Sequence, residues 1–94
     1  MELVSITRSP RAGKKWRAKF RVEGRERNTD FGASGYEDYT QHGDEKRAAA
    51  YRKRHQKDLA TRDPTRAGFL SYYILWASPN FDANVRAYRR HFGL

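Results

Sequence analysis

Residues Ala67 to Trp76 carry no charge and are apolar or aromatic at almost every position. Asp63, just before this stretch, is typical of a helix N-cap, and Pro64 suits the first helical position, where its missing N–H would be unpaired anyway. A helix that is apolar all round must be covered on more than one side. The stretch therefore predicts a central helix over residues 64–76 of a small domain.

One side of this predicted helix is open to two interpretations. At about 100° per residue, three aromatic side chains fall nearly opposite the face that carries Leu70 and Ile74. They belong either to the core or to a docking face for another protein, because exposed apolar patches mark interfaces. The three candidates for a protein interface are Phe69, Tyr72 and Trp76.

The chain is strongly basic: its 94 residues include 20 Lys and Arg against 11 Asp and Glu, a net charge of +9. This balance favours a polyanionic partner, with nucleic acid first and an anionic membrane surface second. No run approaches the roughly 20 apolar residues of a membrane span, and no signal peptide opens the chain, so no membrane insertion is expected. The absence of cysteine excludes disulfides and cysteine-based zinc sites, which fits an intracellular protein.

The first third of the chain predicts three strands, over residues 2–7, 15–22 and 25–31. Short turns at Ser9–Gly13 and Glu23–Gly24 separate them, which is typical of an antiparallel meander. Alternation of period two places the apolar side chains of the second strand on one face, which needs a helix over it. These side chains are Trp16, Ala18, Phe20 and Val22.

The rest of the chain predicts an ordered loop and three helices. Tyr36 and Tyr39 are expected to pin the loop to the body of the protein. The helices are expected from Asp44 to Leu59 or Ala60, from Pro64 to Trp76, and from Pro79, with Ser78 as its cap, to Phe92. The prediction is a single α+β domain of order βββααα, with the sheet in residues 1–32, the loop in 33–43 and the helices in 44–94.

A row of basic side chains on the second strand is the main candidate for function. Its charges recur about every 6.5–7 Å along an extended strand, which approximates the spacing of phosphates along a nucleic-acid backbone. The alternative is a solvated outer face without a ligand. The row consists of Lys15, Arg17, Lys19 and Arg21, and Lys14, Arg25 and Arg27 could continue the surface.

Arg52 interrupts the otherwise uncharged face of the first helix. A charge in such a position costs free energy unless it is paired. We expect a structural ion pair with Asp38 or Glu37, which would hold the loop against the helix, and His55 is expected to be a partly buried, satisfied side chain. No nucleophile elbow, P-loop or dinucleotide fingerprint is present, so no catalytic residue, metal or cofactor is expected and the protein is not expected to be an enzyme.

Three strands followed by a helix that contains Ala48-Ala49-Ala50-Tyr51 resemble two DNA-binding folds over roughly residues 3–60. These are the plant AP2-type domain and the arm-binding domain of phage integrases. The resemblance implies that the sheet enters the major groove and that one helix backs it.

A second resemblance covers most of the chain and is to a family of small, basic, uncharacterised proteins of large double-stranded DNA viruses of algae and amoebae. It implies a viral protein in the host cytoplasm or nucleus, or in the virion, and raises two roles: binding or packaging of DNA, and a structural part of the particle. The motifs that carry it are Gly13-Lys14-Lys15-Trp16-Arg17-Ala18, Phe31-Gly32-Ala33-Ser34-Gly35-Tyr36-Glu37-Asp38-Tyr39-Thr40-Gln41-His42, Tyr51-Arg52-Lys53-Arg54-His55, Asp63-Pro64 and Leu70-Ser71-Tyr72-Tyr73-Ile74-Leu75-Trp76.

The sequence therefore predicts a non-enzymatic nucleic-acid-binding module that contacts phosphates through the basic sheet face. Double-stranded DNA is the expected partner, with DNA favoured over RNA, and sequence specificity is expected to be weak because phosphate contacts carry no base information. The alternative is a minor structural component of the virus particle, which acts by binding other virion proteins or itself.

Overall fold

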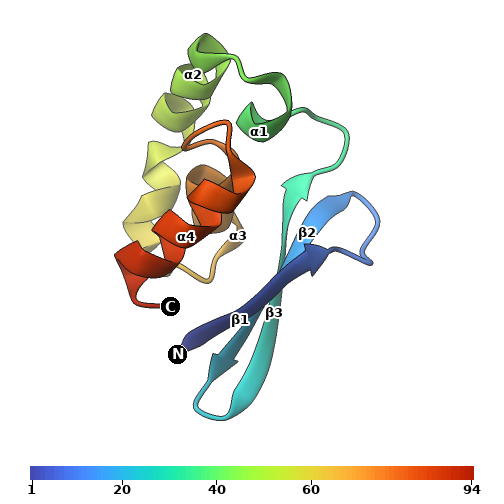
Figure 1. Cartoon of the computed structure of the whole chain (residues 1–94), viewed down its shortest axis with the longest axis vertical. Helices are drawn as coiled ribbons and strands as arrows, with labels where there is room; N and C mark the ends of the chain where they lie inside the picture. Colours follow the sequence, from blue (N-terminus) through green and yellow to red (C-terminus); the bar gives the residue numbers. More distant parts are fainter.

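Three strands form one antiparallel sheet of order β1–β2–β3 in the computed structural model, which describes residues 1–94 (Figure 1). They span Glu2–Arg8 (β1), Lys14–Val22 (β2) and Arg25–Ala33 (β3). Glu23 and Gly24 join β2 to β3 and both have positive φ, as a type I′ hairpin turn requires. The predicted three-stranded meander is confirmed.

The register of the sheet decides which side chains share a face. Trp16 of β2 lies opposite Phe31 of β3, and Phe20 lies opposite Leu3 of β1, so the predicted apolar face is continuous across all three strands. A bulge between Leu3 and Ser5 accommodates Val4 as an extra residue. The sheet thus presents one apolar face to the helices and one polar face away from them.

Four α-helices follow the sheet, where the sequence predicted three. The additional one, α1, is a single turn inside the predicted loop. It exists because Asp38 and Gln41 form a capping box at its start, and Gly43 ends it in the left-handed conformation. The helices are Tyr39–His42 (α1), Glu45–His55 (α2), Ala67–Leu70 (α3) and Phe81–Phe92 (α4), with a 3₁₀ segment at Gln56–Thr61 (η1) and a π-helical segment at Ser71–Leu75 (η2).

The central helix begins at Ala67 and not at Pro64, which corrects the prediction. Asp63 is not its N-cap: its carboxylate accepts hydrogen bonds from the N–H and the hydroxyl of Thr65 in a turn. The Tyr88 hydroxyl donates to the carbonyl of Pro64, and the Thr29 hydroxyl donates to that of Thr65. These bonds tie the segment to α4 and to the sheet before the helix starts.

The last helix also begins later than predicted. Its N-cap is Asn80, whose side chain accepts a hydrogen bond from the N–H of Ala83, and its first residue is Phe81. Ser78 is not the cap, because its hydroxyl donates to Asn84 and accepts from the N–H of Asn80. Pro79 therefore lies in the turn that precedes α4.

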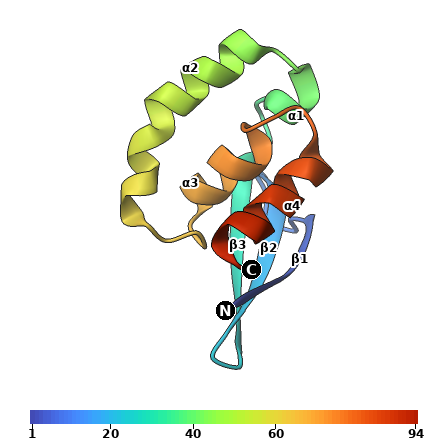
Figure 2. The same cartoon turned by 60° about the vertical axis from the view of Figure 1, so that its left-hand side comes forward.

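The apolar face of the sheet is covered by the second half of the chain. Figure 2 shows α3 and α4 between the sheet and α2, which is the outermost helix. The resemblance to AP2-type and integrase domains implied that the first predicted helix backs the sheet. In the structure this helix, α2, does not cover the sheet. The fully buried core consists of Leu3, Ala18, Phe20, Phe31, Leu70, Ile74, Leu75 and Tyr88.

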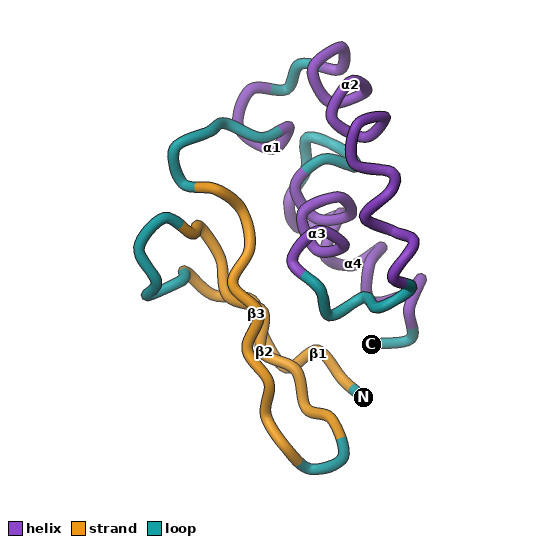
Figure 3. The backbone as a smooth tube through the Cα atoms, turned by 180° about the vertical axis from the view of Figure 1, so that it is seen from behind, coloured by secondary structure: helices purple, strands orange, loops and turns teal.

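The tip of the β2–β3 hairpin projects beyond the helical layer (Figure 3). At the opposite end of the sheet, β3 leads through residues 34–38 into α1, beside α2. No helix of the chain is both long enough and apolar enough to cross a bilayer.

Candidate functional site

All four members of the basic row on β2 lie on the polar face of the sheet, and each contacts an acidic side chain. The partners come from β1, from β3 and from the N-cap of α1. Salt bridges join Lys15 to Asp38 at 2.8 Å, Arg17 to Asp30 at 2.9 Å, Lys19 to Glu26 at 3.9 Å and Arg21 to Glu2 at 2.6 Å. The row is therefore locally neutralised, although the sequence of β2 alone is strongly basic.

Arg17 and Asp30 form the best-defined pair on this face. Two guanidinium nitrogens of Arg17 donate to the two carboxylate oxygens of Asp30, and the Ser9 hydroxyl donates to the same carboxylate. The hydrogen bonds from Arg17 lower the pKa of Asp30 to about 2, although burial of the carboxyl opposes this shift.

This pair predicts a loss of stability in acid. Asp30 keeps its charge in the folded protein below pH 4, whereas the unfolded chain takes up a proton near its ordinary pKa of about 3.9. The contribution of the pair is therefore complete above about pH 4 and falls as the pH drops toward about 2. Urea unfolding at a series of pH values should show a steeper acid loss in wild type than in Asp30→Asn. Parallel pH profiles would contradict the assignment.

Lys15 connects the sheet to α1. Its ammonium donates to the carboxylate of Asp38 at 2.8 Å and to the side chain of Gln41 at 2.6 Å. Only 11% of the Lys15 side chain and 4% of the Asp38 side chain are exposed. Lys15 is therefore a structural link, and little of it is available to a ligand.

The remaining basic candidates lie elsewhere on the sheet. The register places Arg27 opposite Phe20 and Arg25 opposite Val22, so these two arginines project from the other face and do not continue the row. Both are exposed, and neither forms an ion pair. Lys14 lies at the start of β2, opposite Ala33. A role of these residues in binding stays a prediction.

The three aromatic residues proposed as a protein interface do not form one exposed patch. Phe69 is only 5% exposed and packs against Tyr73 and Phe92. Trp76 is half-buried and stacks on Tyr51 at a ring-centroid distance of 4.1 Å. Tyr72 is half-buried as well. Most of this aromatic surface belongs to the packing of the domain.

Arg52 is paired, but not with the predicted partner. It donates to the carboxylate of Glu45 at 2.7 Å and to the backbone carbonyl of Trp76 at 2.7 Å. Glu45 lies two helical turns earlier on the same helix and also accepts a hydrogen bond from the Tyr39 hydroxyl. Asp38 is held by Lys15, and Glu37 forms no ion pair. The predicted link from Arg52 to Asp38 or Glu37 is therefore wrong, because closer partners compete for both ends.

The basic side chains of α2 contrast with those of β2. Only six of the twenty Lys and Arg residues of the chain form an ion pair, and α2 carries only one of these, Arg52. The others on α2 and at the start of η1 are exposed and unpaired, and they form two rows whose members are spaced four or seven residues apart. They are Lys46, Lys53 and Lys57 in one row, and Arg47 and Arg54 in the other.

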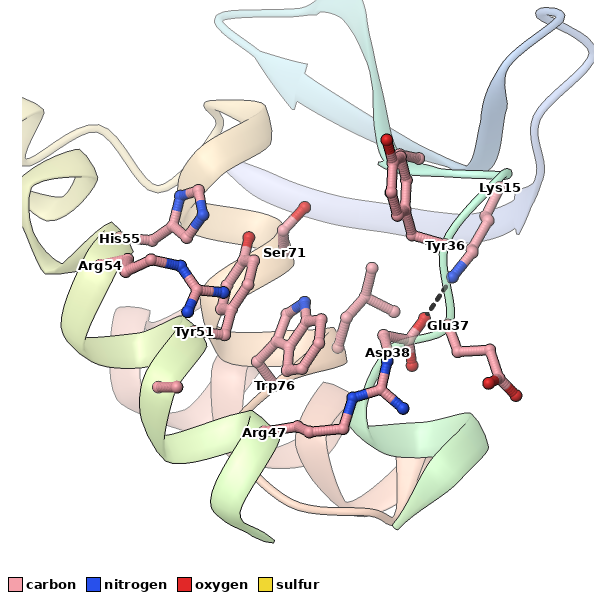
Figure 4. Close-up of a pocket in the computed structure, with 14 residues that line it drawn as sticks. Lys15, Tyr36, Glu37, Asp38, Arg47, Tyr51, Arg54, His55, Ser71 and Trp76 are labelled. Atoms are coloured by element: carbon pink, nitrogen blue, oxygen red, sulfur yellow. Dashed lines mark hydrogen bonds and ion pairs between the residues drawn. The ribbon is translucent and has the colours of Figure 1, made fainter. Parts of the chain in front are cut away.

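A cleft of about 560 Å³ lies between α2 and the segment that joins β3 to α1 (Figure 4). Arg47, Tyr51 and Arg54 line it from α2, and Tyr36 and Glu37 line it from the opposite side. The remaining lining residues are Lys15, Gly32, Ala33, Asp38, Ala50, His55, Ser71, Leu75 and Trp76.

A stack of three rings forms one wall of this cleft. Trp76, Tyr51 and His55 lie one above the next, with successive ring centroids 4.1 Å apart. Burial raises the pKa of the Tyr51 hydroxyl to about 12, so this group is neutral at physiological pH. His55 also contacts the carboxylate of Asp58 at 3.0 Å, in agreement with its expected role as a satisfied side chain. The stack gives the cleft an aromatic wall between the two arginines.

The segment at the floor of the cleft is π-helical, and the sequence pattern did not indicate this. Ser71, Leu75 and Trp76 reach the cleft from η2 and the residue after it. Gly32 permits the close approach of this floor to the sheet, because a Cβ at residue 32 would lie 2.9 Å from a methyl carbon of Leu75. The φ of Gly32 is also +81°, which disfavours any other residue.

These observations define a small basic α+β domain with an aromatic-lined cleft. Residues 4–55, more than half of the chain, match a family of unknown function, DUF5754, and the chain belongs to this family. The match covers all of the sheet except the first two residues of β1, together with α1, α2 and most of the cleft, whereas Ser71, Leu75 and Trp76 lie outside it. No curated protein and no solved structure matches the chain.

Proposed function

We propose that this protein is a non-enzymatic nucleic-acid-binding module whose phosphate contacts come mainly from α2. The observation that carries the proposal is the set of exposed, unpaired Lys and Arg side chains along this helix. Basic side chains without acidic partners gain most from a phosphate, because no intramolecular ion pair has to break. A net charge of +9 on 94 residues supports the same partner class.

The basic row of β2 is a weaker candidate for these contacts. Each of its four side chains already contacts a carboxylate, so a phosphate would compete with an existing pair. Phosphate contacts through Arg17, Lys19 and Arg21 nevertheless remain the alternative placement of the interface on this domain. The two placements lie on different elements and can be tested separately.

The resemblance to proteins of large double-stranded DNA viruses supports DNA over RNA as the partner. The second candidate role, a structural component of a virus particle, was raised by the same resemblance and would use the aromatic face of the central helix together with charged faces. The burial of Phe69 and the stacking of Trp76 leave that role less support than nucleic-acid binding. The large exposed apolar side chains are Met1, Val4 and Tyr36.

The test is the salt dependence of binding to a short fluorescein-labelled DNA duplex, measured by fluorescence anisotropy. Binding through phosphates predicts that affinity falls steeply with salt, with a log–log slope of roughly −0.9 for each phosphate neutralised. In the double variant Lys53→Gln/Lys57→Gln this slope should become shallower by about two, because each lysine removed eliminates about one phosphate contact. Both side chains are exposed and unpaired, so the fold should be unaffected.

The matched control is Lys19→Gln/Arg21→Gln, which removes the same charge from the polar face of the sheet. We expect this control to keep the wild-type slope. The reverse result, with the α2 variant unchanged and the sheet variant shallower, would move the interface to β2. Wild-type affinity that does not depend on salt would refute phosphate-led binding on either face.

A further inference from the structure

We propose that the cleft between α2 and the β3–α1 segment receives one unpaired nucleobase, so that the protein binds single-stranded nucleic acid more tightly than a duplex. This inference rests on the proposed function and adds a substrate class to it. Phosphates alone do not require a cleft, whereas a base outside its helix needs a pocket of its own size with an aromatic surface.

The cleft is large enough for such a guest, and its walls are partly aromatic. Its volume of about 560 Å³ lies within the range of roughly 300–1,000 Å³ that is usual for small-molecule sites. One wall is the stack of Trp76, Tyr51 and His55, and the floor includes Leu75 and Ser71. These groups are held by packing and need not reorganise when a planar ring enters.

Tyr36 supplies the opposite wall and is the most informative residue of the cleft. Its side chain is 76% exposed, and no other Phe, Trp or Tyr of the chain is exposed to a comparable degree. The turn that carries it is closed by a hydrogen bond from the N–H of Tyr36 to the carbonyl of Ala33. Figure 4 shows its ring across the cleft from Tyr51 and Trp76. An exposed aromatic ring beside basic groups is the usual platform on which single-stranded bases stack.

The charged side chains of the cleft suit the phosphates of a nucleotide and the polar edge of its base. Arg47 and Arg54 line the cleft from α2, and neither forms an ion pair, so both are available to the phosphates on either side of the base. Glu37, on the far side, also has no partner and can accept hydrogen bonds from the N–H groups of a base edge. In a duplex these edges are paired and the faces are stacked, so a duplex cannot use the cleft.

The experiment compares one labelled oligonucleotide as a single strand and as a duplex, by fluorescence anisotropy at the same salt concentration. Wild type should prefer the single strand. Tyr36→Ala should weaken single-strand binding by at least about fivefold, the equivalent of about 1 kcal/mol of base stacking, and leave duplex binding unchanged. Tyr36→Phe should retain the preference, because it keeps the ring. The high exposure of Tyr36 means that neither variant should unfold, and equal melting temperatures would verify this.

The outcomes separate this inference from the proposed function. Equal affinity for single strand and duplex, with no effect of Tyr36→Ala, would overturn the cleft assignment, and salt-dependent binding through α2 would still stand. A single-strand preference that survives Tyr36→Ala would also overturn the assignment. If neither form bound in a salt-dependent way, the proposed function itself would fail.

Discussion

Replacing Leu70 by alanine is expected to lower the free energy of unfolding by about 3–5 kcal/mol, the usual cost of a fully buried leucine. Leu70 is 0% exposed and belongs to the central core cluster, which joins the sheet to the helices. A domain of this size has only about 5–15 kcal/mol of stability in total, so the variant should lose a large fraction of it. Urea unfolding followed by circular dichroism measures the change.

Val4→Ala is the matched control for this prediction. Val4 is an aliphatic residue at the bulge of β1 and is exposed, so its truncation should change stability by no more than about 0.5 kcal/mol. If Leu70→Ala and Val4→Ala had the same effect, the central segment would not be the core of the domain.

Lys15→Met is expected to cost about 3–5 kcal/mol, the range for breaking a buried ion pair by removing one partner. The substitution leaves the carboxylate of Asp38 only 4% exposed and without its cation. The double variant Lys15→Met/Asp38→Asn should recover much of this loss, because asparagine can still cap α1 and carries no charge. A double-mutant cycle by urea unfolding isolates the pair energy, and additive single effects would show that the two groups are not coupled.

Hydrogen exchange provides a second readout for the same pair. Lys15 joins β2 to the first turn of α1, so Lys15→Met should lower the protection of residues 38–43 more than that of the sheet. Equal loss of protection everywhere would mean that the pair contributes to global stability alone.

The sheet could be predicted from sequence because each of its signals is local. The alternation from Trp16 to Val22 identifies the buried face, and the pair Glu23-Gly24 identifies a two-residue turn. The same turn also fixes the pairing of β2 with β3, which places Asp30 opposite Arg17 and Glu26 opposite Arg21. The pairing of Arg17 with Asp30 was therefore available in the sequence from cross-strand register, whereas the partner of Lys15, Asp38, lies outside the sheet.

The number and the ends of the helices were predicted less well than the strands, because helix ends depend on hydrogen bonds with residues that are distant in the sequence. The start at Ala67 follows from side chains of Thr29 and Tyr88 that bind the carbonyls before it. The π-helical form of η2 cannot be recognised from the 3.6-residue periodicity of the sequence. The cleft depends on both, since it assembles side chains from β2, the β3–α1 segment, α2 and η2. The sequence predicted that Tyr36 would pin the loop to the body, whereas its side chain is 76% exposed and lies across the cleft from Arg47 and Arg54. This arrangement could not be predicted, because it depends on all of these segments.

Two side chains donate hydrogen bonds to backbone carbonyls at the end of η2, one from a residue before this segment in the sequence and one from a residue after it. Arg52 of α2 donates to the carbonyl of Trp76, and Asn84 of α4 donates to that of Ile74. Four of the eight core residues, moreover, come from the chain after residue 55, where the family match ends. A fragment limited to residues 4–55 would thus expose the inner face of the sheet and leave Arg52 without its carbonyl. We therefore expect the part of this chain that is needed for folding to be longer than the segment that the family model matches, and to extend at least to Tyr88.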